Sequence, residues 1–209
     1  MKLIPETIKD FGYLKIFDLY SDTELKSIWK EIFYLDCVMD KMDGQSKIDM
    51  EDLRAPTDSG GSKMSGEGLF LDNIYRNREH SAILSSNRKL FTDEDINKSI
   101  RDTHPSNDNQ YKCINRDLTL LNRYSNTQEY APHTDSATFT AITILLHKPK
   151  QVAGGDFNFP DYDISFGCKN NSCLIFPSWV SHSVSKLRCF GEARRYSIAQ
   201  LMFVGADIT

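Results

Sequence analysis

At 209 residues the chain is long enough for one folded domain but short for two full ones. Apolar residues make up 40% of the sequence and charged residues 26%, which allows a hydrophobic core without disulfides and excludes a disordered chain. The formal net charge of −4 provides no overall positive field of the kind that draws proteins onto nucleic acid or anionic membranes.

The cysteines and the first residues of the chain bear on its compartment. The five cysteines are an odd count without C-x-x-C spacing, which argues against a disulfide framework or a zinc knuckle and favours reduced thiols. Residues 1–10 contain no apolar stretch of signal-peptide length, and no run approaches the roughly 18 apolar residues of a membrane span. We therefore expect a cytoplasmic protein without a membrane partner.

Two segments of the N-terminal half predict helices. A Ser-x-x-Glu capping box begins at Ser21, and apolar residues then recur at helical spacing, which predicts a helix over residues 22–36. Residues 78–102 predict two short helices, the second of them capped by Thr92 or Asp93.

Residues 41–68 are polar and rich in Gly, Ser and Asp, so this segment can bury little apolar surface. We expect a mobile loop here. It is either a lid that closes over bound substrate or an ordinary surface loop.

The character of the chain changes after about residue 110. The runs "LTLLNRY", "ATFTAITILLH", "DFNF", "SCLIFP" and "RYSIAQLMFV" are rich in β-branched and aromatic residues and are separated by Gly, Pro, Asn and Asp, which predicts short strands. Such strands with helices upstream indicate a mainly β, α+β fold, a sandwich or jelly roll with helices on one sheet. We expect a single domain over residues 1–209, with 1–110 as helical support and 111–205 as the jelly-roll core.

His133 and Asp135 are the first candidate site residues. On an extended strand, residues i and i+2 point to the same face, so this pair can offer a nitrogen and a carboxylate oxygen to one cation. With five histidines and 29 acidic residues, roughly 0.7 His-x-Asp/Glu tripeptides are expected by chance. The tripeptide alone therefore also fits two polar neighbours without a metal.

His182 is a candidate third ligand. It follows an apolar strand that runs into Pro177, in "CLIFPSWVSHSVS". Two histidines and one carboxylate on one face of an octahedron leave positions open, an arrangement that favours non-haem Fe(II). The alternative is a histidine that ends a strand and bonds a backbone carbonyl.

Arg195 stands at the head of a strand, and the small residues Ser197 and Ala199 share its face. A buried guanidinium needs an anionic partner, because an unpaired charge in a core costs several kcal/mol, and its planar fork suits a carboxylate. A dicarboxylate that chelates iron at one end and meets Arg195 at the other would satisfy both groups. A surface arginine paired with Glu192 is the alternative, which fits Arg194 better.

Four motifs, in order, resemble the Fe(II)- and 2-oxoglutarate-dependent oxygenases, most closely their prolyl 4-hydroxylase branch. The family pattern Y-x-x-G-Q-x-Y-x-x-H-x-D is similar to "YSNTQEYAPHTD", where only Thr127 differs, replacing the glycine. "GGDFNFP", "LIFPSWVSHSV" and "RYSI" resemble the family's G-G-x-L-x-F, L-x-F-P-S-x-x-x-H-x-V and R-x-S-L. The resemblance covers about residues 118–203.

The resemblance implies a double-stranded β-helix, or jelly roll, and assigns roles to individual residues. His133, Asp135 and His182 would be catalytic as the ligands of Fe(II). Arg195 would hold the distal carboxylate of the co-substrate 2-oxoglutarate, and the Tyr124 hydroxyl would bond the same group. O₂ would be the second co-substrate, and ascorbate an optional reductant.

The substrate would meet two aromatic residues. The resemblance implies that Tyr130 stands near the substrate entrance. Trp179, between Pro177 and His182, is a second candidate substrate-binding residue that either lines the mouth of the site or caps the core.

Three departures from the family pattern bear on 2-oxoglutarate and not on the iron ligands. Collagen-type prolyl hydroxylases carry lysine where this chain has Arg195, so the match favours arginine-bearing members. The segment before this arginine is longer than usual, which leaves Arg194 as an alternative. Leu145 stands where some members have a second co-substrate-binding tyrosine, which predicts fewer hydrogen bonds.

The resemblance implies hydroxylation of an unactivated C–H, with release of succinate and CO₂. A prolyl residue in a peptide, a free amino acid and another small metabolite are all compatible with the motifs, because specificity lies in loops. The alternatives are an inactive jelly-roll binding module and an oxygenase acting on nucleic acid. We expect no nucleic-acid partner, because the chain is acidic overall. The oligomeric state is left open.

Overall fold

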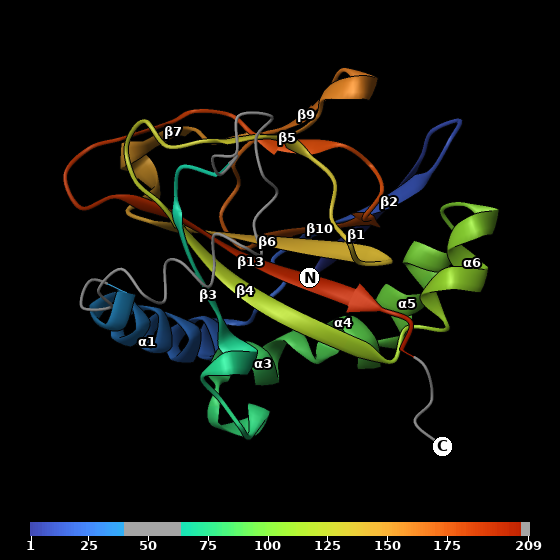
Figure 1. Ribbon diagram of the computed structural model, residues 1–209, viewed down its shortest axis with the longest axis horizontal. Helices are drawn as coiled ribbons and strands as arrows, with labels where there is room; N and C mark the ends of the chain where they lie inside the picture. The colour runs from blue at the N-terminus through green and yellow to red at the C-terminus, as the bar shows by residue number, and fades with distance from the viewer. Residues whose placement is uncertain (40–63, 206–209) are drawn as a thin grey trace.

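The computed structural model describes residues 1–39 and 64–205, and the expected loop over residues 41–68 therefore lies almost entirely outside the described residues. Three layers are stacked in Figure 1, with helices below, a large sheet in the middle and a smaller sheet above. No described helix is both long enough and apolar enough to cross a membrane.

The large sheet is antiparallel throughout. Its seven strands, in spatial order, are β1 (Lys2–Thr7), β2 (Gly12–Phe17), β10 (Ser172–Pro177), β6 (Phe139–His147), β13 (Arg194–Phe203), β4 (Arg116–Tyr124) and β3 (Glu67–Phe70).

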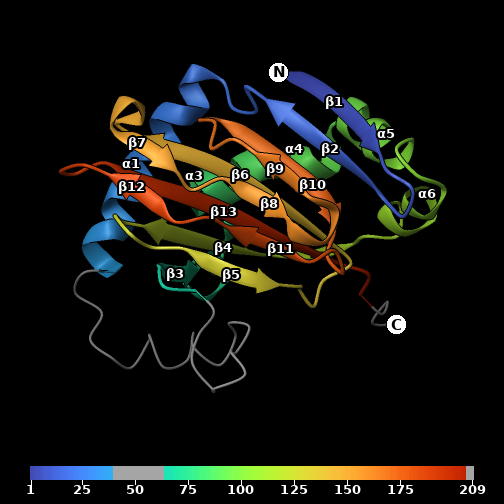
Figure 2. The ribbon, with the colours of Figure 1, turned by 90° about the horizontal axis from the view of Figure 1, so that it is seen from above.

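The smaller sheet faces it, as the view from above in Figure 2 shows. It has four strands, β5 (Tyr130–His133), β11 (His182–Val184), β8 (Phe157–Phe159) and β9 (Ile164–Phe166). A two-stranded ribbon lies beside it, formed by β12 (Leu187–Cys189) and β7 (Val152–Gly154). The expected mainly β fold with a jelly-roll core and accompanying helices is confirmed.

The two helices with a predicted N-terminal cap begin where the sequence predicts, whereas residues 78–102 form three short helices instead of the expected two. Helix α1 (Asp22–Met39) starts with the capping box: the Ser21 amide donates to Glu24 Oε2 at 2.8 Å and the Glu24 amide to Ser21 Oγ at 3.4 Å. Helix α5 (Glu94–Arg101) is capped by Asp93, whose carboxylate accepts from the Ile96 amide, so Asp93 and not Thr92 is the cap. The remaining helices are α3 (Ala82–Asn87), α4 (Lys89–Thr92) and α6 (Pro105–Tyr111), with short 3₁₀ turns at Leu71–Asn73, Arg78–His80, Pro149–Gln151 and Pro160–Tyr162.

The first 110 residues also contribute strands, which the sequence did not predict. β1 and β2 form an antiparallel pair, and β2 continues the large sheet by pairing with β10, with Phe17 opposite Ser172. β3 pairs with β4 at the other edge. This segment is therefore helical support only in part, because its strands β1, β2 and β3 extend the large sheet at both edges.

Alternation along the strands of the large sheet gives it two apolar faces. On β13, Tyr196, Ile198 and Met202 pack in one core with Ile28 and Ile32 of α1. The intervening positions face the smaller sheet, where a second core holds apolar and aromatic residues such as Ala199, Ile142, Phe157 and Phe176. The space between the sheets is thus lined by alternate residues of β4, β6 and β13.

Candidate metal centre

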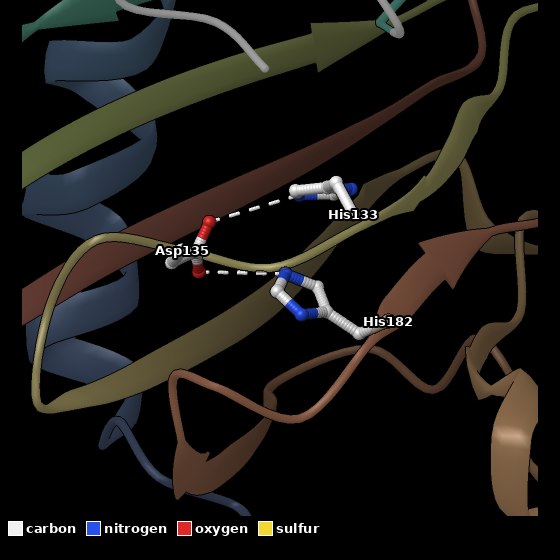
Figure 3. A group of neighbouring side chains, drawn as sticks. All are labelled: His133, Asp135 and His182. Carbon is white, nitrogen blue, oxygen red and sulfur yellow. Dashed lines mark ion pairs between the residues drawn. The ribbon is translucent and has the colours of Figure 1, made fainter.

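Strand pairing brings the three expected metal ligands together. β5 and β11 are neighbouring antiparallel strands, and His133 and His182 lie directly opposite each other in their register. Asp135 follows β5 after one residue, and its amide donates to the Ser178 carbonyl at 3.0 Å. Figure 3 shows both imidazoles directed at the Asp135 carboxylate.

The ligand atoms are close enough to share one ion. His133 Nε2 lies 3.7 Å from Asp135 Oδ1, and His182 Nε2 lies 3.4 Å from Asp135 Oδ2. One ligand atom from each of the three residues falls within 4.8 Å of the others. Three ligands from one side leave the rest of an octahedral shell for co-substrates, the arrangement typical of non-haem Fe(II).

Backbone carbonyls orient both imidazoles. His133 Nδ1 lies 2.9 Å from the Ala131 carbonyl, and His182 Nδ1 lies 3.0 Å from the Val180 carbonyl. A carbonyl can only accept, so Nδ1 carries a proton in each ring and Nε2 is the nitrogen that faces the cluster, where it can bind a metal ion in its deprotonated form. The donor atoms of these residues therefore suit a metal ion. The hydrogen bond of His182 to the Val180 carbonyl orients the ring for metal binding and is not an alternative to it.

Asp135 is held in its ligating form. Burial by itself would raise the pKa of Asp135, but hydrogen bonding and charge from His182, a hydrogen bond from Thr140 and the nearby His133 together hold this pKa below its ordinary value. The Thr140 hydroxyl donates to Asp135 Oδ2 at 2.6 Å and lies 2.7 Å from Ser178 Oγ. The carboxylate is therefore charged and fixed in orientation.

Aromatic rings pack around the histidines. The Tyr130 ring stacks on His133 with 3.7 Å between ring centroids and 16° between planes. Phe157 stacks on His182 at 5.4 Å, and Phe176 meets the same imidazole edge to face at 4.9 Å. These rings exclude water from one side of the cluster.

Arg195 is the buried cation that the sequence predicts. Its side chain is 0% exposed, and none of its three guanidinium nitrogens has a hydrogen-bond partner among the described residues. The guanidinium carbon lies 5.0 Å from the centre of the Tyr124 ring, its register partner on β4. Cys168 lies nearby, but burial raises the pKa of its thiol despite the charge of Arg195, so the thiol is neutral and does not balance the cation.

Arg194 has partners of its own. Its guanidinium donates to the Gly191 and Ala193 carbonyls at 2.9 and 2.8 Å. Glu192, the expected partner of Arg194, pairs with Lys148 at 2.6 Å. The structure therefore places Arg195, not Arg194, where an uncompensated charge calls for a carboxylate.

Tyr124 and Leu145, the two other positions expected beside the co-substrate, lie in different parts of the structure. Tyr124 is buried and lines the same cavity as the three ligands. Leu145 does not, because it lies on the helix-facing side of β6 and packs in the outer core. The interpretation of Leu145 as a missing tyrosine in the pocket is therefore corrected: its neighbours Ile144 and Leu146 face the space between the sheets.

The two candidate substrate residues are separated. Tyr130 lines the cavity beside His133. Trp179 is 53% exposed, rests edge to face on Phe11 at 5.7 Å and is not part of the cavity lining. Trp179 therefore neither caps the core as a buried residue nor contacts this cavity.

The family glycine replaced by Thr127 has a conformational explanation. Thr127 has a φ of 70°, in the left-handed region that favours glycine and disfavours β-branched residues. Its amide donates to the Leu187 carbonyl at 2.8 Å, which ties the turn to β12. The turn keeps its shape in spite of the substitution.

Sequence reasoning missed Thr140, Ser178 and Asn122. The two hydroxyl residues contact Asp135 or each other only after β6 and β10 pair, which no local pattern reveals. Asn122 lines the cavity two residues before Tyr124, so strand alternation from Tyr124 would have identified it.

Comparison with known proteins agrees with this geometry. The model of a family described as the 2OG-Fe(II) oxygenase superfamily matches residues 119–203. A comparison with curated protein sequences gives no match.

Solved structures of prolyl hydroxylases share the fold. A Pseudomonas putida prolyl-4-hydroxylase gives a TM-score of 0.60 at 11% identity, over 94% of this chain and 95% of that one. A prolyl hydroxylase from Trichoplax adhaerens, in complex with a hypoxia inducible factor peptide fragment, gives a TM-score of 0.56 at 12% identity, over 93% of this chain and 84% of that one. The viral collagen prolyl hydroxylase of Paramecium Bursaria Chlorella virus-1 gives a TM-score of 0.52 at 15% identity, over 92% of this chain and 96% of that one.

Residues 119–203, which hold all three ligands and Arg195, match the model of the 2OG-Fe(II) oxygenase superfamily. The fold of the chain is prolyl 4-hydroxylase-like, and the resemblance seen in the sequence motifs is confirmed.

Proposed function

We propose that this protein is an Fe(II)- and 2-oxoglutarate-dependent dioxygenase that hydroxylates an unactivated C–H of a prolyl residue or a free amino acid. The observation that carries the proposal is the pairing of a His-Asp-His cluster with a fully buried arginine that has no acceptor among the described residues. A dicarboxylate that is also a metal chelator matches both features.

Each residue has a defined part in this proposal. His133, Asp135 and His182 hold the ion through atoms that already face one point. Arg195 and Tyr124 bind the far carboxylate of 2-oxoglutarate, and Phe157 and Phe176 keep water away. When bound, iron supplies the oxidative chemistry that consumes O₂ and 2-oxoglutarate and releases succinate and CO₂, with ascorbate as an optional reductant.

The prolyl assignment is supported by the solved neighbours, which are named as prolyl hydroxylases. The intact ligand set favours an enzyme over an inactive binding module. The net charge of −4 favours a small-molecule or peptide substrate over nucleic acid. The proposal includes a cytoplasmic location, which the five unpaired cysteines support.

The test begins with 2-oxoglutarate binding to the Fe(II)-loaded full-length protein, measured anaerobically by calorimetry. Arg195→Met is expected to weaken binding by about thirtyfold or more, because truncating a buried charge pair costs about 2–5 kcal/mol. Arg194→Met is the matched control and should bind 2-oxoglutarate as the wild type does, since its guanidinium contacts only backbone carbonyls.

Turnover is then followed as succinate release, with and without proline-containing peptides and free amino acids. His133→Ala should release none. A wild type that binds no 2-oxoglutarate, or a His133→Ala variant that turns over normally, would refute the proposal.

A further inference from the structure

The ribbon formed by β7 and β12 turns one row of side chains outward. Leu187 and Cys189 are buried, whereas Lys186, Arg188 and Phe190, which alternate with them, are exposed. Alternate residues of an extended chain share a face, so these three side chains form a single row, the β12 row. Figure 2 shows the ribbon at the end of the molecule away from α6.

The β12 row carries two cations that this part of the chain does not neutralise. Neither Lys186 nor Arg188 forms an ion pair within residues 1–39 and 64–205. Glu192, the first acidic residue after the row, pairs with Lys148 at 2.6 Å. The positive charge of the row is therefore available to an external partner.

An exposed aromatic ring continues the row. Phe190 is 73% exposed, the highest value among the large apolar side chains of the described residues. Its amide donates to the Gln151 carbonyl at 3.3 Å, so the backbone that carries the ring is tied to the end of β7. An apolar ring held in solvent beside two cations suits a partner that is acidic and also partly apolar.

The backbone of the row is fixed from both sides. On one side β12 pairs with β7, where Arg188 lies opposite the small, exposed Ala153. On the other side the Leu187 amide donates to the Gln128 carbonyl at 2.9 Å, and the Thr127 amide donates to the Leu187 carbonyl at 2.8 Å. Because the backbone is already ordered, a ligand that binds the row pays little for ordering it.

The spacing of the row matches that of an extended peptide. Alternate residues on a strand lie roughly 6–7 Å apart, and an extended ligand spaces its own alternate side chains equally. Two acidic side chains at alternate positions can therefore meet Lys186 and Arg188 one to one, and an apolar side chain one step further can lie against Phe190.

Single-stranded nucleic acid also combines anions with flat rings, but it fits the chain less well. Its affinity depends on many phosphate contacts, and the β12 row offers two cations. The chain carries a net charge of −4, so apart from these two cations the remainder carries −6 and repels a long polyanion. A short acidic segment of a protein needs to contact only the row.

We infer that the β12 row is a docking site for an extended acidic segment of another protein, with acidic residues at alternate positions and an apolar residue beyond them. The inference goes beyond the proposed function, because this binding needs neither iron nor turnover. None of the sequence motifs that point to the metal site includes residues 186–190.

The test is fluorescence anisotropy with the full-length protein and a labelled peptide that carries three glutamates at alternate positions followed by a leucine. Binding should weaken as salt is added. Lys186→Glu combined with Arg188→Glu should weaken it by about tenfold or more, because two attractive contacts become repulsive.

Lys26→Glu combined with Lys30→Glu is the matched control. Both lysines are exposed on α1, on the other side of the large sheet, and the change in net charge is the same. This control should bind the peptide as the wild type does. Equal weakening in the two double variants would mean that overall charge and not the β12 row attracts the peptide, which overturns the inference.

Two further measurements test the ring and the spacing. Phe190→Ser should weaken peptide binding severalfold at an unchanged melting temperature, since the ring lies largely outside the core. A peptide of the same composition with its glutamates adjacent should bind less tightly than the alternating one. If neither change has an effect, the row does not recognise an extended acidic segment.

The remaining outcomes are also decisive. A wild type that does not bind the alternating peptide overturns the inference, and so does a single-stranded oligonucleotide of equal charge that binds the row more tightly. If the double Glu variant does not fold, Lys186→Gln combined with Arg188→Gln decides, and unchanged binding by that variant overturns the inference. Failure of 2-oxoglutarate binding in the same preparations overturns only the proposed function.

Discussion

Thr140 shows how a residue that touches no metal can control the metal site. Its hydroxyl donates to Asp135 Oδ2 and also contacts Ser178 Oγ, so it ties the carboxylate to β6 and to the residue that follows β10. Partners of this kind orient the ligands, and their loss typically weakens metal binding by about tenfold to a hundredfold.

We therefore expect Thr140→Val to weaken Fe(II) binding by about tenfold to a hundredfold, measured anaerobically by competition with a chelator. Thr143→Val is the control, since Thr143 is equally buried three residues along β6 but lies on the helix-facing side of this strand, with Ala141 and Leu145. Equal losses of affinity in both variants would mean that the effect comes from the strand and not from the contact with Asp135.

The turn between β7 and β8 packs against the side chain of Arg195. Gly155 has a φ of 70°, and a Cβ there would lie 2.6 Å from Leu187 Cδ1 and 3.1 Å from Arg195 Cδ. A glycine is thus required for two reasons, the backbone conformation and the close approach of the arginine stem.

Gly155→Ala is expected to destabilise the fold by about 1–2 kcal/mol through the positive φ and, in addition, to displace Arg195 and weaken 2-oxoglutarate binding. Gly191→Ala separates the two effects, because Gly191 also has a positive φ of 59° but a Cβ there meets nothing within 4 Å. Chemical denaturation and calorimetry give the two quantities. If both variants bind 2-oxoglutarate equally well, the packing of Gly155 against Arg195 is irrelevant to the site.

At the scale of the whole molecule, the fold does not depend on the metal. One core joins the helices to the large sheet and another fills the space between the sheets, and both consist of buried apolar side chains. The ligands lie at one edge of the second core, so the ion adds to the stability of a folded chain instead of creating it.

Removal of the metal with a chelator should therefore leave the far-UV circular dichroism unchanged. At a free Fe(II) concentration of about 100 times its dissociation constant, binding adds about 2.7 kcal/mol, which corresponds to a rise in melting temperature of roughly 5–11 °C for a chain of this size. His133→Ala should show little of this rise. A metal-free chain that is unfolded would show that the ion is structural.

Local patterns in the sequence account for much of the fold and for the metal ligands. The capping box of α1, the main strands of the jelly roll and the His-x-Asp pair at the end of β5 all depend on residues within a few positions of one another. Such features depend on backbone geometry alone, so a single sequence is enough to predict them.

Tertiary pairing decided the rest. The N-terminal strands β1 and β2 join the sheet only through β10, more than 150 residues away, and the hydroxyl contact of Asp135 requires β6 and β10 to pair. The sequence left Arg194 and Arg195 as alternatives for the carboxylate-binding arginine, and only the complete burial of Arg195 in the folded chain distinguishes the two. The sequence also left the position of Trp179 open between the mouth of the site and the core, and it did not identify Asn122 as a cavity-lining residue. Which side chains face a shared cavity depends on the register between strands distant in the chain, and local periodicity carries no information about that register.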